Sequence, residues 1–242
     1  MIALTIDCEQ WNCPLLEGKE TEENDNTSFS KKGNGVILDL LDKYNIKATF
    51  FITGYFAEKE PEQVKQIKER GHEIACHGCN HFYRGNKNFD IKQDIIKAKE
   101  ILEKITGKSI DGFRAPQMQY SEKLIEILSD LNFKYDSSLH PCYLPGHYNN
   151  LNKPIIISKP LKNRSIIEIP VSVSSFRMPI GWLFTRLFGI NRTIAVFKNL
   201  LKRGMTPVLY FHSWEFVKME SKYVPFIIIF AQENLLQKTL RN

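Results

Sequence analysis

Two histidines four residues apart, His77 and His81, follow a short apolar segment of the chain. In a tight turn or one helical turn, this spacing puts both imidazoles on the same side, where they can bind one metal ion. Cys76 and Cys79 in the same segment offer another interpretation, a redox pair or half of a thiolate zinc site. A structural zinc site needs four protein ligands, and the sequence has no second Cys-x-x-Cys. The histidine pair therefore predicts a metal site.

Two carboxylates, Asp7 and Glu9, stand at the end of the first apolar segment with Cys8 between them. Strand alternation sends both carboxylates to one side and Cys8 to the other. One carboxylate can then bind a divalent cation while the other takes a proton from the metal's water. A site of two histidines and one carboxylate also leaves positions for water and a substrate carbonyl. A helix cap or a surface turn is the alternative for this segment.

Two further residues with the right chemistry also follow apolar segments. His212 ends the last clear one, where it can serve as a third ligand or as a general acid that protonates a leaving amine. Arg114 can hold a base carboxylate in its charged form by charge pairing. His72 is interpreted as structural, and His140 and His147, which fall in a predicted loop, receive no role.

The elements that must position these residues alternate between short apolar strands and amphipathic helices. Strands are predicted over residues 2–6, 48–53, 74–76, 110–114, 133–135, 166–170 and 207–211. Helices are predicted over 35–44, 61–71, 90–105, 121–131 and roughly 181–203, with long surface loops over 12–34 and 140–165. Repeated strand–helix units are typical of a parallel sheet with helices outside. Because the reactive side chains follow strands, whose ends meet on one face of a parallel barrel, we predict an α/β barrel rather than an open sheet.

Length and composition are those of one globular domain over residues 1–242, with 43% hydrophobic and 25% charged residues. The net charge of +6 is modest and the basic residues are spread over predicted helices, so solvated helix faces are preferred over a nucleic-acid site. The chain opens on a predicted strand without a basic leader. The late apolar run over 224–231 has eight residues, fewer than the roughly 20 that span a bilayer. Five cysteines, an odd number, fit a reducing compartment, so we expect a cytoplasmic protein.

Taken in order, these motifs resemble the polysaccharide deacetylase family, the NodB-homology carbohydrate esterases. The similar segments are Thr5-Ile6-Asp7, His77-x-x-x-His81, Arg114-Ala115-Pro116 and Tyr210-Phe211-His212, which span nearly the whole chain. Residues 135–138 (Tyr-Asp-Ser-Ser) and 212–215 (His-Ser-Trp-Glu) are similar to an exopolysaccharide-type branch of the family. Each motif alone is a weak signal, whereas the ordered set is a strong one.

The resemblance implies a distorted (β/α) barrel of about seven parallel strands. It also implies a divalent metal, commonly zinc, with cobalt or nickel as alternatives, held by a carboxylate and the two histidines of the pair. By the same resemblance Asp7 is the general base, Arg114 orients Asp7, and His212 is the general acid.

The chain departs from the family at one position of the first motif. The family usually has a second aspartate there as a metal ligand, and this chain has Cys8. A related branch with Asp-x-Asp/Glu makes Glu9 the ligand beside His77 and His81, and strand alternation also favours Glu9. Cys8 is the alternative ligand if the chain twists at this point.

The sequence and the resemblance together predict a metal-dependent hydrolase that removes N-acetyl groups from a glycan, with an intracellular glycan precursor favoured. Two alternatives stay open: a metal-independent amidohydrolase of the same fold that opens a cyclic ureide, and a catalytically silent carbohydrate-binding barrel. Four aromatic residues are expected near the mouth of the site to stack on sugar rings: Trp11, Tyr120, Tyr143 and Trp214. Trp182 and Phe184 lie in a predicted helix and are interpreted as packing. Neither the oligomeric state nor a role for Asp136 follows from the sequence.

Overall fold

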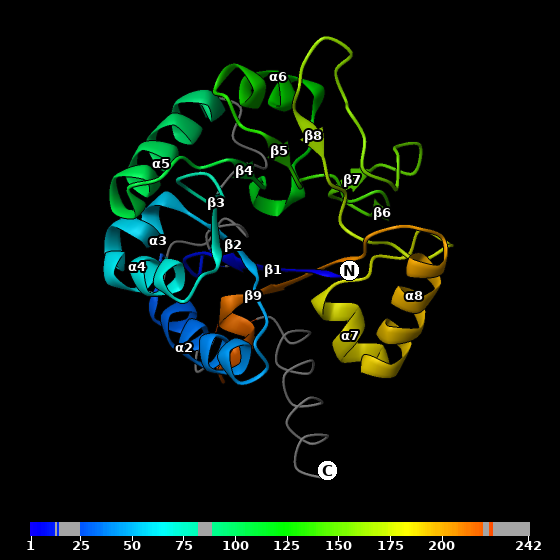
Figure 1. Ribbon diagram of the computed structural model, residues 1–242, viewed down its shortest axis with the longest axis horizontal. Coiled ribbons are helices and arrows are strands. Elements are labelled where there is room, and N and C mark those ends of the chain that lie inside the picture. Colours follow the sequence, from blue (N-terminus) through cyan, green and yellow to red (C-terminus); the bar gives the residue numbers. More distant parts are fainter. Residues whose placement is uncertain (13, 15–24, 82–88, 220–222, 225–242) are drawn as a thin grey trace.

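Seven parallel strands form one curled sheet in the computed structural model, which describes residues 1–12, 14, 25–81, 89–219 and 223–224 (Figure 1). Their order is β8-β5-β4-β3-β2-β1-β9. The strands are β1 (Ala3–Cys8), β2 (Thr49–Ile52), β3 (Glu73–Cys76), β4 (Gly112–Phe113), β5 (Tyr135–Asp136), β8 (Ile167–Glu168) and β9 (Val208–His212). Because β8 and β9 stand at the two ends of this order, the sheet is an open half-barrel. The predicted distorted barrel of about seven parallel strands is confirmed.

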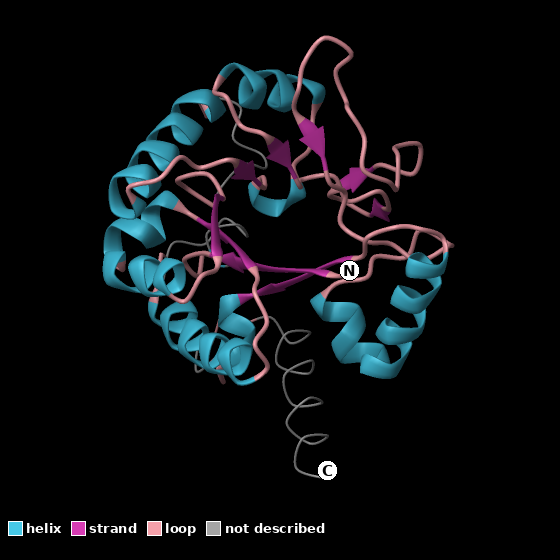
Figure 2. Cartoon of the chain, viewed as in Figure 1, coloured by secondary structure: helices cyan, strands magenta, loops and turns pink. Residues whose placement is uncertain are grey.

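Helices cover the outer side of this sheet (Figure 2). They are α2 (Ser28–Lys43), α3 (Gly54–Lys59), α4 (Pro61–Glu69), α5 (Ile91–Thr106), α6 (Glu122–Asp130), α7 (Trp182–Phe188) and α8 (Ile190–Lys202), with 3₁₀ turns η1 (Pro116–Met118) and η2 (Ser213–Phe216). Local chemistry sets several of their ends. The side chains of Asp90 and Ser121 accept the amide hydrogens of Gln93 and Leu124, which caps α5 and α6. Gly107 closes α5 in the left-handed conformation.

The predicted loop over 12–34 is wrong for its last part, because α2 begins at Ser28. Gly33 and Asn34, at the end of the predicted loop, lie inside the helix and make close contacts with η2. A Cβ on Gly33 would overlap the carbonyl oxygen of Ser213. The Asn34 side chain accepts the Ser213 hydroxyl at 2.6 Å and donates to Gln63 at 2.8 Å. These two residues serve tertiary contact, which a local pattern does not reveal.

The structure also divides two other predicted segments. The helix predicted over 181–203 is two helices, α7 and α8, because Gly189 has φ 86° and ψ 155°, which no helix accommodates. The predicted loop over 140–165 contains a small antiparallel pair, β6 (Tyr143–Leu144) and β7 (Tyr148–Asn149).

We expect Gly33→Ala to lower the free energy of unfolding by about 1–3 kcal/mol, because the new methyl group overpacks the contact between α2 and η2. Gly35→Ala is the matched control in the same helix. A Cβ on Gly35 meets nothing within 4 Å, so this variant should gain up to about 1 kcal/mol of helix propensity. Urea unfolding of both variants checks the prediction, and equal stability of the two would contradict it.

Candidate active site

The register of the sheet brings one layer of functional side chains together. One row of the register joins four neighbouring strand ends: Cys8, Ile52, Cys76 and Phe113. These four side chains are buried in the core under the helices. Side chains alternate along a strand, so the next residues, Glu9, His77 and Arg114, lie on the inner side. Asp7 and His212 are register partners on β1 and β9 one row earlier, which places them on the inner side as well.

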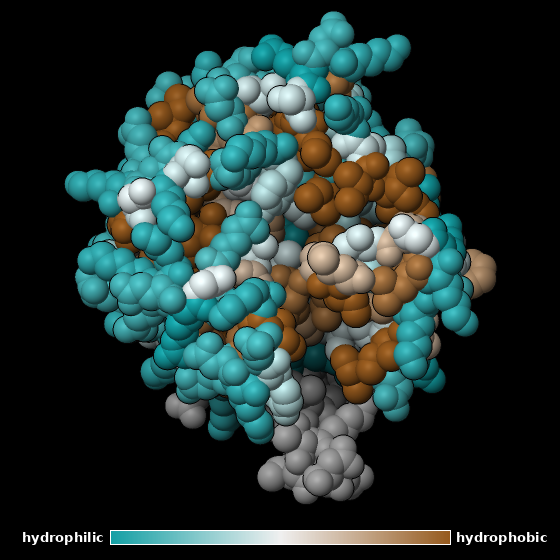
Figure 3. All heavy atoms as spheres, in the orientation of Figure 1, coloured by the Kyte–Doolittle hydropathy of each residue, from teal (hydrophilic) through white to brown (hydrophobic). Residues whose placement is uncertain are grey.

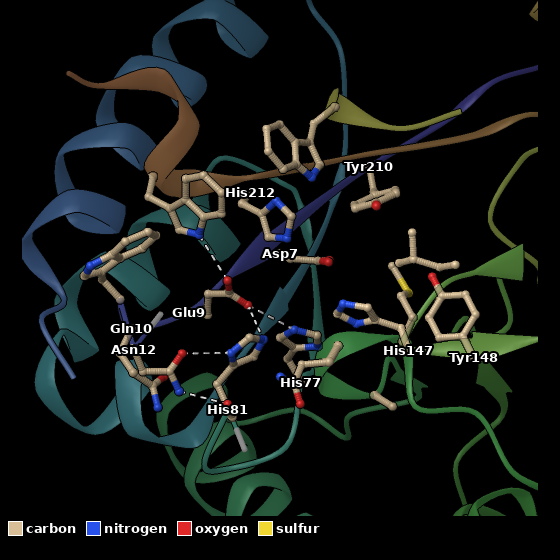
Figure 4. A pocket seen from close by; sticks show the side chains of 17 residues that line it. Asp7, Glu9, Gln10, Asn12, His77, His81, His147, Tyr148, Tyr210 and His212 are labelled. Carbon is tan, nitrogen blue, oxygen red and sulfur yellow. Dashed lines mark hydrogen bonds and ion pairs between the residues drawn. The ribbon is translucent and has the colours of Figure 1, made fainter. Parts of the chain in front are cut away.

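A pocket of about 310 Å³ lies at this end of the strands, and Figure 4 shows it from close by. Its functional groups come from four segments that are far apart in the sequence: Asp7 and Glu9, His77 and His81, His147 and Tyr148, and Tyr210 and His212. The structure therefore brings the predicted base, metal ligands and acid into one cavity. Arg114 lies behind the pocket wall, in contact with Asp7.

Glu9, His77 and His81 form the one cluster of potential metal ligands found among the described residues. Their ligand atoms all lie within 4.8 Å of one another. Glu9 Oε2 is 3.3 Å from His77 Nε2 and 2.8 Å from His81 Nε2. Figure 4 shows the three side chains converging from β1 and from the segment after β3. Cys8 faces the core instead, where Asn34 donates to its sulfur, so the alternative ligand points away from this cluster.

Hydrogen bonds to the other ring nitrogens prepare both imidazoles for a metal. His77 Nδ1 lies 2.8 Å from the carbonyl oxygen of Arg114, and His81 Nδ1 lies 3.1 Å from Asn12 Oδ1. The Asn12 amide nitrogen donates to the His81 carbonyl at 2.8 Å, which fixes Oδ1 as the acceptor. Both Nδ1 atoms therefore donate, so that when the imidazoles are neutral, as a metal requires, the free lone pair is on each Nε2, the atom that faces Glu9.

The Glu9 carboxylate is held in the form and orientation that a metal ligand needs. Trp214 Nε1 donates to Glu9 Oε1 at 3.0 Å, while the buried Oε2 accepts no hydrogen bond from the described residues. Burial opposes ionisation, but the imidazoles of His81, His77 and His212 hold the pKa of Glu9 well below its usual range. One ionised carboxylate oxygen and two imidazole lone pairs fit a divalent cation such as zinc.

Asp7 is fixed by a fully buried arginine. Arg114 Nη1 donates to Asp7 Oδ1 at 2.6 Å and to the Thr5 hydroxyl at 2.9 Å. Its other nitrogens donate to the carbonyl and hydroxyl oxygens of Ser137 at 3.1 and 3.0 Å. The guanidinium also lies 4.1 Å over the ring of Phe51. This network keeps Asp7 next to a permanent positive charge.

Two buried carboxyl groups, Asp136 and Glu168, support the turn that holds Arg114. Burial raises the pKa of Asp136, and burial together with the Asp136 charge raises the pKa of Glu168 well above its usual range, so the pair shares a proton. Asp136 accepts the Ser138 hydroxyl at 2.6 Å, and Ser138 accepts the Ala115 amide at 2.7 Å. Glu168 accepts the Leu139 amide at 3.1 Å. Asp136 thus has a structural place outside the pocket.

His212 is surrounded by groups that favour its protonated form. Its Nδ1 lies 2.9 Å from Glu215 Oε1, and its ring stacks on Trp214 with 4.7 Å between centroids and an angle of 19°. Burial alone would lower the pKa of His212, but the Glu215 hydrogen bond and the charges of Glu9, Glu215 and Asp7 raise it to about 9. His212 is therefore charged at neutral pH and has a proton to donate.

We expect Glu215→Gln to move the pKa of His212 in the metal-free protein from about 9 toward the ordinary value of about 6.5. The amide keeps an acceptor for Nδ1 but removes the charge. Because the folded pKa is raised, the stability from this pair is complete below about pH 6.5 and is lost as the pH rises through about 9. Imidazole NMR titration measures the shift independently of the amount of folded protein. An unchanged His212 pKa would contradict this assignment of the cause.

The aromatic residues of the pocket differ from the predicted set. Trp11 and Trp214 line the pocket as expected, but Tyr120 and Tyr143 do not. Trp182, interpreted from the sequence as packing, is a wall residue at the start of α7, and its ring meets that of His212 edge-on at 5.8 Å. The helix pattern gave no sign that α7 would point its first residue into the site.

The sequence also missed the pocket residues supplied by the β6–β7 pair. His147 and Tyr148, which had received no role, line the pocket from the turn and the second strand.

His72 lies outside the pocket, where its Nδ1 accepts the Ala48 amide at 3.3 Å, in line with a structural role. Burial raises the pKa values of the Cys76 and Cys79 thiols, which disfavours reactive thiolates there. Cys13 lies outside the described residues.

Comparison with known proteins relates this architecture to glycan deacetylases. A structure from Mycobacterium smegmatis, classed among the polysaccharide deacetylases, has the same fold, with a TM-score of 0.65 and 21% identity over 98% of this chain and 82% of that one. The sequence model for polysaccharide deacetylases matches residues 25–135, and a second model, for a domain of unknown function, matches residues 137–241. The match over residues 25–135 supports the polysaccharide deacetylase family that the motifs predicted.

Curated relatives have names that specify the glycan. A peptidoglycan deacetylase of Helicobacter pylori is 36% identical over 104 residues, which cover 43% of this chain and 36% of that protein. A peptidoglycan-N-acetylglucosamine deacetylase of Bacillus cereus is 38% identical over 98 residues, 40% of this chain and 36% of that protein. The matched part is thus about a third of the length of each relative. The exopolysaccharide-type branch stays a prediction.

Proposed function

We propose that this protein is a metal-dependent hydrolase that removes acetyl groups from the N-acetylated sugars of a glycan. The observation that carries the proposal is the convergence of Glu9, His77 and His81 beside the Asp7–Arg114 pair and His212 in one pocket. The match of residues 25–135 to the polysaccharide deacetylase model and the relatives named peptidoglycan deacetylases support an N-acetylhexosamine as the reacting sugar. The alternatives of ureide opening and of silent glycan binding have likeness of fold alone behind them, because an allantoinase and a pseudoenzyme of similar fold are only 16% and 13% identical to this chain.

The residues divide the hydrolysis between a base side and an acid side of the pocket. A divalent cation such as zinc would supply Lewis-acid polarisation of the acetyl carbonyl and acidification of a bound water. Glu9 and the two histidines hold that cation. Asp7, oriented by its hydrogen bond from Arg114, takes the proton of the attacking water. His212 gives its proton to the sugar nitrogen as the C–N bond breaks, which releases acetate and a free amine.

The pocket wall supplies the contacts for a sugar ring. Three indole rings lie on one side of the cavity, those of Trp11, Trp182 and Trp214. The ring centroid of Trp214 is 5.5 Å from that of Trp11 and 5.7 Å from that of Trp182. Tyr148 and His147 form the side supplied by the β6–β7 pair. Flat apolar faces and a few polar groups are the usual lining of a small-molecule site. We propose that the acetamido group enters between these two sides.

The test is release of acetate from chitin oligomers and from peptidoglycan fragments by the purified full chain. We expect release that a chelator abolishes and that zinc, cobalt or nickel restores. A chelated protein that opens cyclic ureides would support the metal-independent alternative, and glycan binding without any acetate would support the silent one. Either result overturns the proposal.

The extent and location of the protein remain proposals of the same kind. One domain over 1–242 is supported by the sheet, because Tyr135 of β5, in the first matched range, pairs with Ile167 of β8, in the second. Location in the cytoplasm stays a prediction.

A further inference from the structure

The chain between residues 140 and 203 differs from the rest in charge. It contains ten of the 33 basic residues and one of the 27 acidic residues, Glu168, whose side chain is buried. This leaves 23 basic and 26 acidic residues for the remainder of the chain. The net positive charge of the protein therefore comes from this stretch alone.

The same stretch holds most of the apolar side chains that water reaches. Of the 19 large hydrophobic residues exposed in the described part of the chain, 13 lie here: Tyr143, Leu144, Leu151, Ile156, Ile157, Ile167, Phe176, Met178, Leu187, Phe188, Ile190, Ile194 and Leu201. In Figure 3, apolar side chains gather on the side of the molecule where α7, α8 and the β6–β7 pair lie in Figure 1. Exposed apolar groups concentrated in this way mark an interaction surface.

These segments form one body on the open side of the half-barrel, and we call residues 140–203 the edge lobe. Arg177 joins two of its parts, because its Nη1 donates to the carbonyl oxygens of Pro141 and Lys153 at 3.2 and 2.7 Å. Ile180 joins a third part, since it is packed in one cluster with Phe197 of α8. The exposed apolar and basic residues thus lie on a single connected lobe.

A rigid tip presents one aromatic residue of the edge lobe to solvent. Val173 and Pro179 form an antiparallel bridge, and the Ser174 amide donates to the Met178 carbonyl at 2.9 Å. Arg177 has a φ of 57°, a conformation that L residues rarely adopt and that its two hydrogen bonds to neighbouring carbonyls hold. Phe176 at this tip is 92% exposed. Hydrogen bonds fix the conformation of this turn, yet the side chain of Phe176 has almost no packing contact within the protein.

Most basic side chains of the edge lobe form no ion pair with a carboxylate in the described part of the chain. Six exposed ones have no ion pair with any described residue: Lys159, Lys162, Arg192, Lys198, Lys202 and Arg203. Exposed basic side chains beside exposed aliphatic and aromatic ones are the composition of surfaces that lie on anionic bilayers. A second copy of the lobe is a poor binding partner, because it would place like charges opposite each other. Nucleic acid is also a poor partner, because it would leave the exposed aliphatic residues without an apolar contact.

We propose that the edge lobe binds the surface of an anionic lipid bilayer, with Phe176 inserted below the headgroups and the cations of α8 against them. No helix among the described residues has the length and apolarity to cross a bilayer. The contact proposed is with one leaflet, through a lobe whose apolar side chains are already on the surface. It does not depend on the deacetylase activity.

The experiment is flotation of the full chain with vesicles of phosphatidylcholine alone and of phosphatidylcholine with phosphatidylglycerol. We expect binding only to the anionic vesicles, and loss of binding between about 0.1 M and about 1 M salt, as the Debye length falls from about 10 to about 3 Å. Arg192→Gln/Lys198→Gln/Lys202→Gln should weaken binding about 100-fold, at about fivefold for each cation. Phe176→Ser should weaken it about tenfold or more.

The matched control removes three exposed cations outside the edge lobe, Lys92→Gln/Lys104→Gln/Lys123→Gln on α5 and α6, and should bind as the parent does. All the substituted side chains are exposed, so the variants should fold, and acetate release from a soluble glycan should not change. Equal weakening by the control, binding that ignores Phe176, or self-association in place of vesicle binding would each overturn the proposal. Vesicle binding by a protein that releases no acetate would leave this proposal standing and count only against the deacetylase function.

Discussion

Asp7→Asn should lower kcat by about two to four orders of magnitude, the usual contribution of a general base, while the metal stays bound. The amide has the shape of the carboxylate and can still accept a hydrogen bond from Arg114, but it cannot take the proton of water. The metal ligands Glu9, His77 and His81 are held by other partners, namely Trp214, the Arg114 carbonyl and Asn12. Acetate release and metal content, measured on the same preparation, check both halves of this prediction.

The Asp7 variant needs a control for stability, because it leaves the buried Arg114 without a charged partner. Breaking a buried ion pair typically costs about 3–5 kcal/mol, so thermal unfolding should be recorded beside kcat, and kcat referred to folded protein. Asp39→Asn removes a carboxylate from an exposed pair with Arg70 and should leave kcat unchanged. Full turnover in the Asp7 variant would refute the base assignment, and loss of metal would make Asp7 a ligand.

His77→Ala/His81→Ala should reduce bound divalent metal from about one equivalent to almost none and abolish acetate release, because one carboxylate cannot hold such an ion alone. Elemental analysis after loading with zinc gives the metal content. The two imidazoles have prepared lone pairs and lie against the same carboxylate oxygen, so each single variant should already weaken binding.

His72→Gln is the matched control, a buried histidine outside the pocket with one of its ring nitrogens bonded to the Ala48 amide. It should keep its metal. A double variant that retains zinc would show that the ion binds elsewhere. A parent protein that takes up no metal when zinc, cobalt or nickel is supplied would end the metal-dependent mechanism, and the ureide and binding alternatives would then be tested.

Residues that follow strands could be placed from the sequence because two regularities act together. Alternation assigns Asp7 and Glu9 to one side and Cys8 to the other, and the structure has Cys8 in the core and both carboxylates in the pocket. Parallel strands bring their ends to one face, which predicts that His77 and His212 meet there. Both inferences depend only on strand identity and order, which short apolar segments show well.

Residues outside the strands could not be placed in this way. Trp182 and His147 reach the pocket from the edge lobe, and their positions depend on how that lobe crosses the open side of the sheet. The hydrophobic periodicity of a short segment carries no information about such a crossing. The prediction of a loop at Gly33 failed for a related reason. In the sequence, a glycine that permits close contact between α2 and η2 cannot be distinguished from a loop glycine.

In the proposed function, the residues that act on the acetyl group and those that contact the sugar come from different parts of the half-barrel. The metal ligands follow β1 and β3, two interior strands of the sheet, whereas the wall of Leu144, Tyr148 and Trp182 is carried by segments on either side of the edge strand β8. Insertions or exchanges in those segments leave the register of β1 to β5 intact. If the proposed function holds, a new glycan preference can arise by changes in those segments while Glu9, His77 and His81 stay in place.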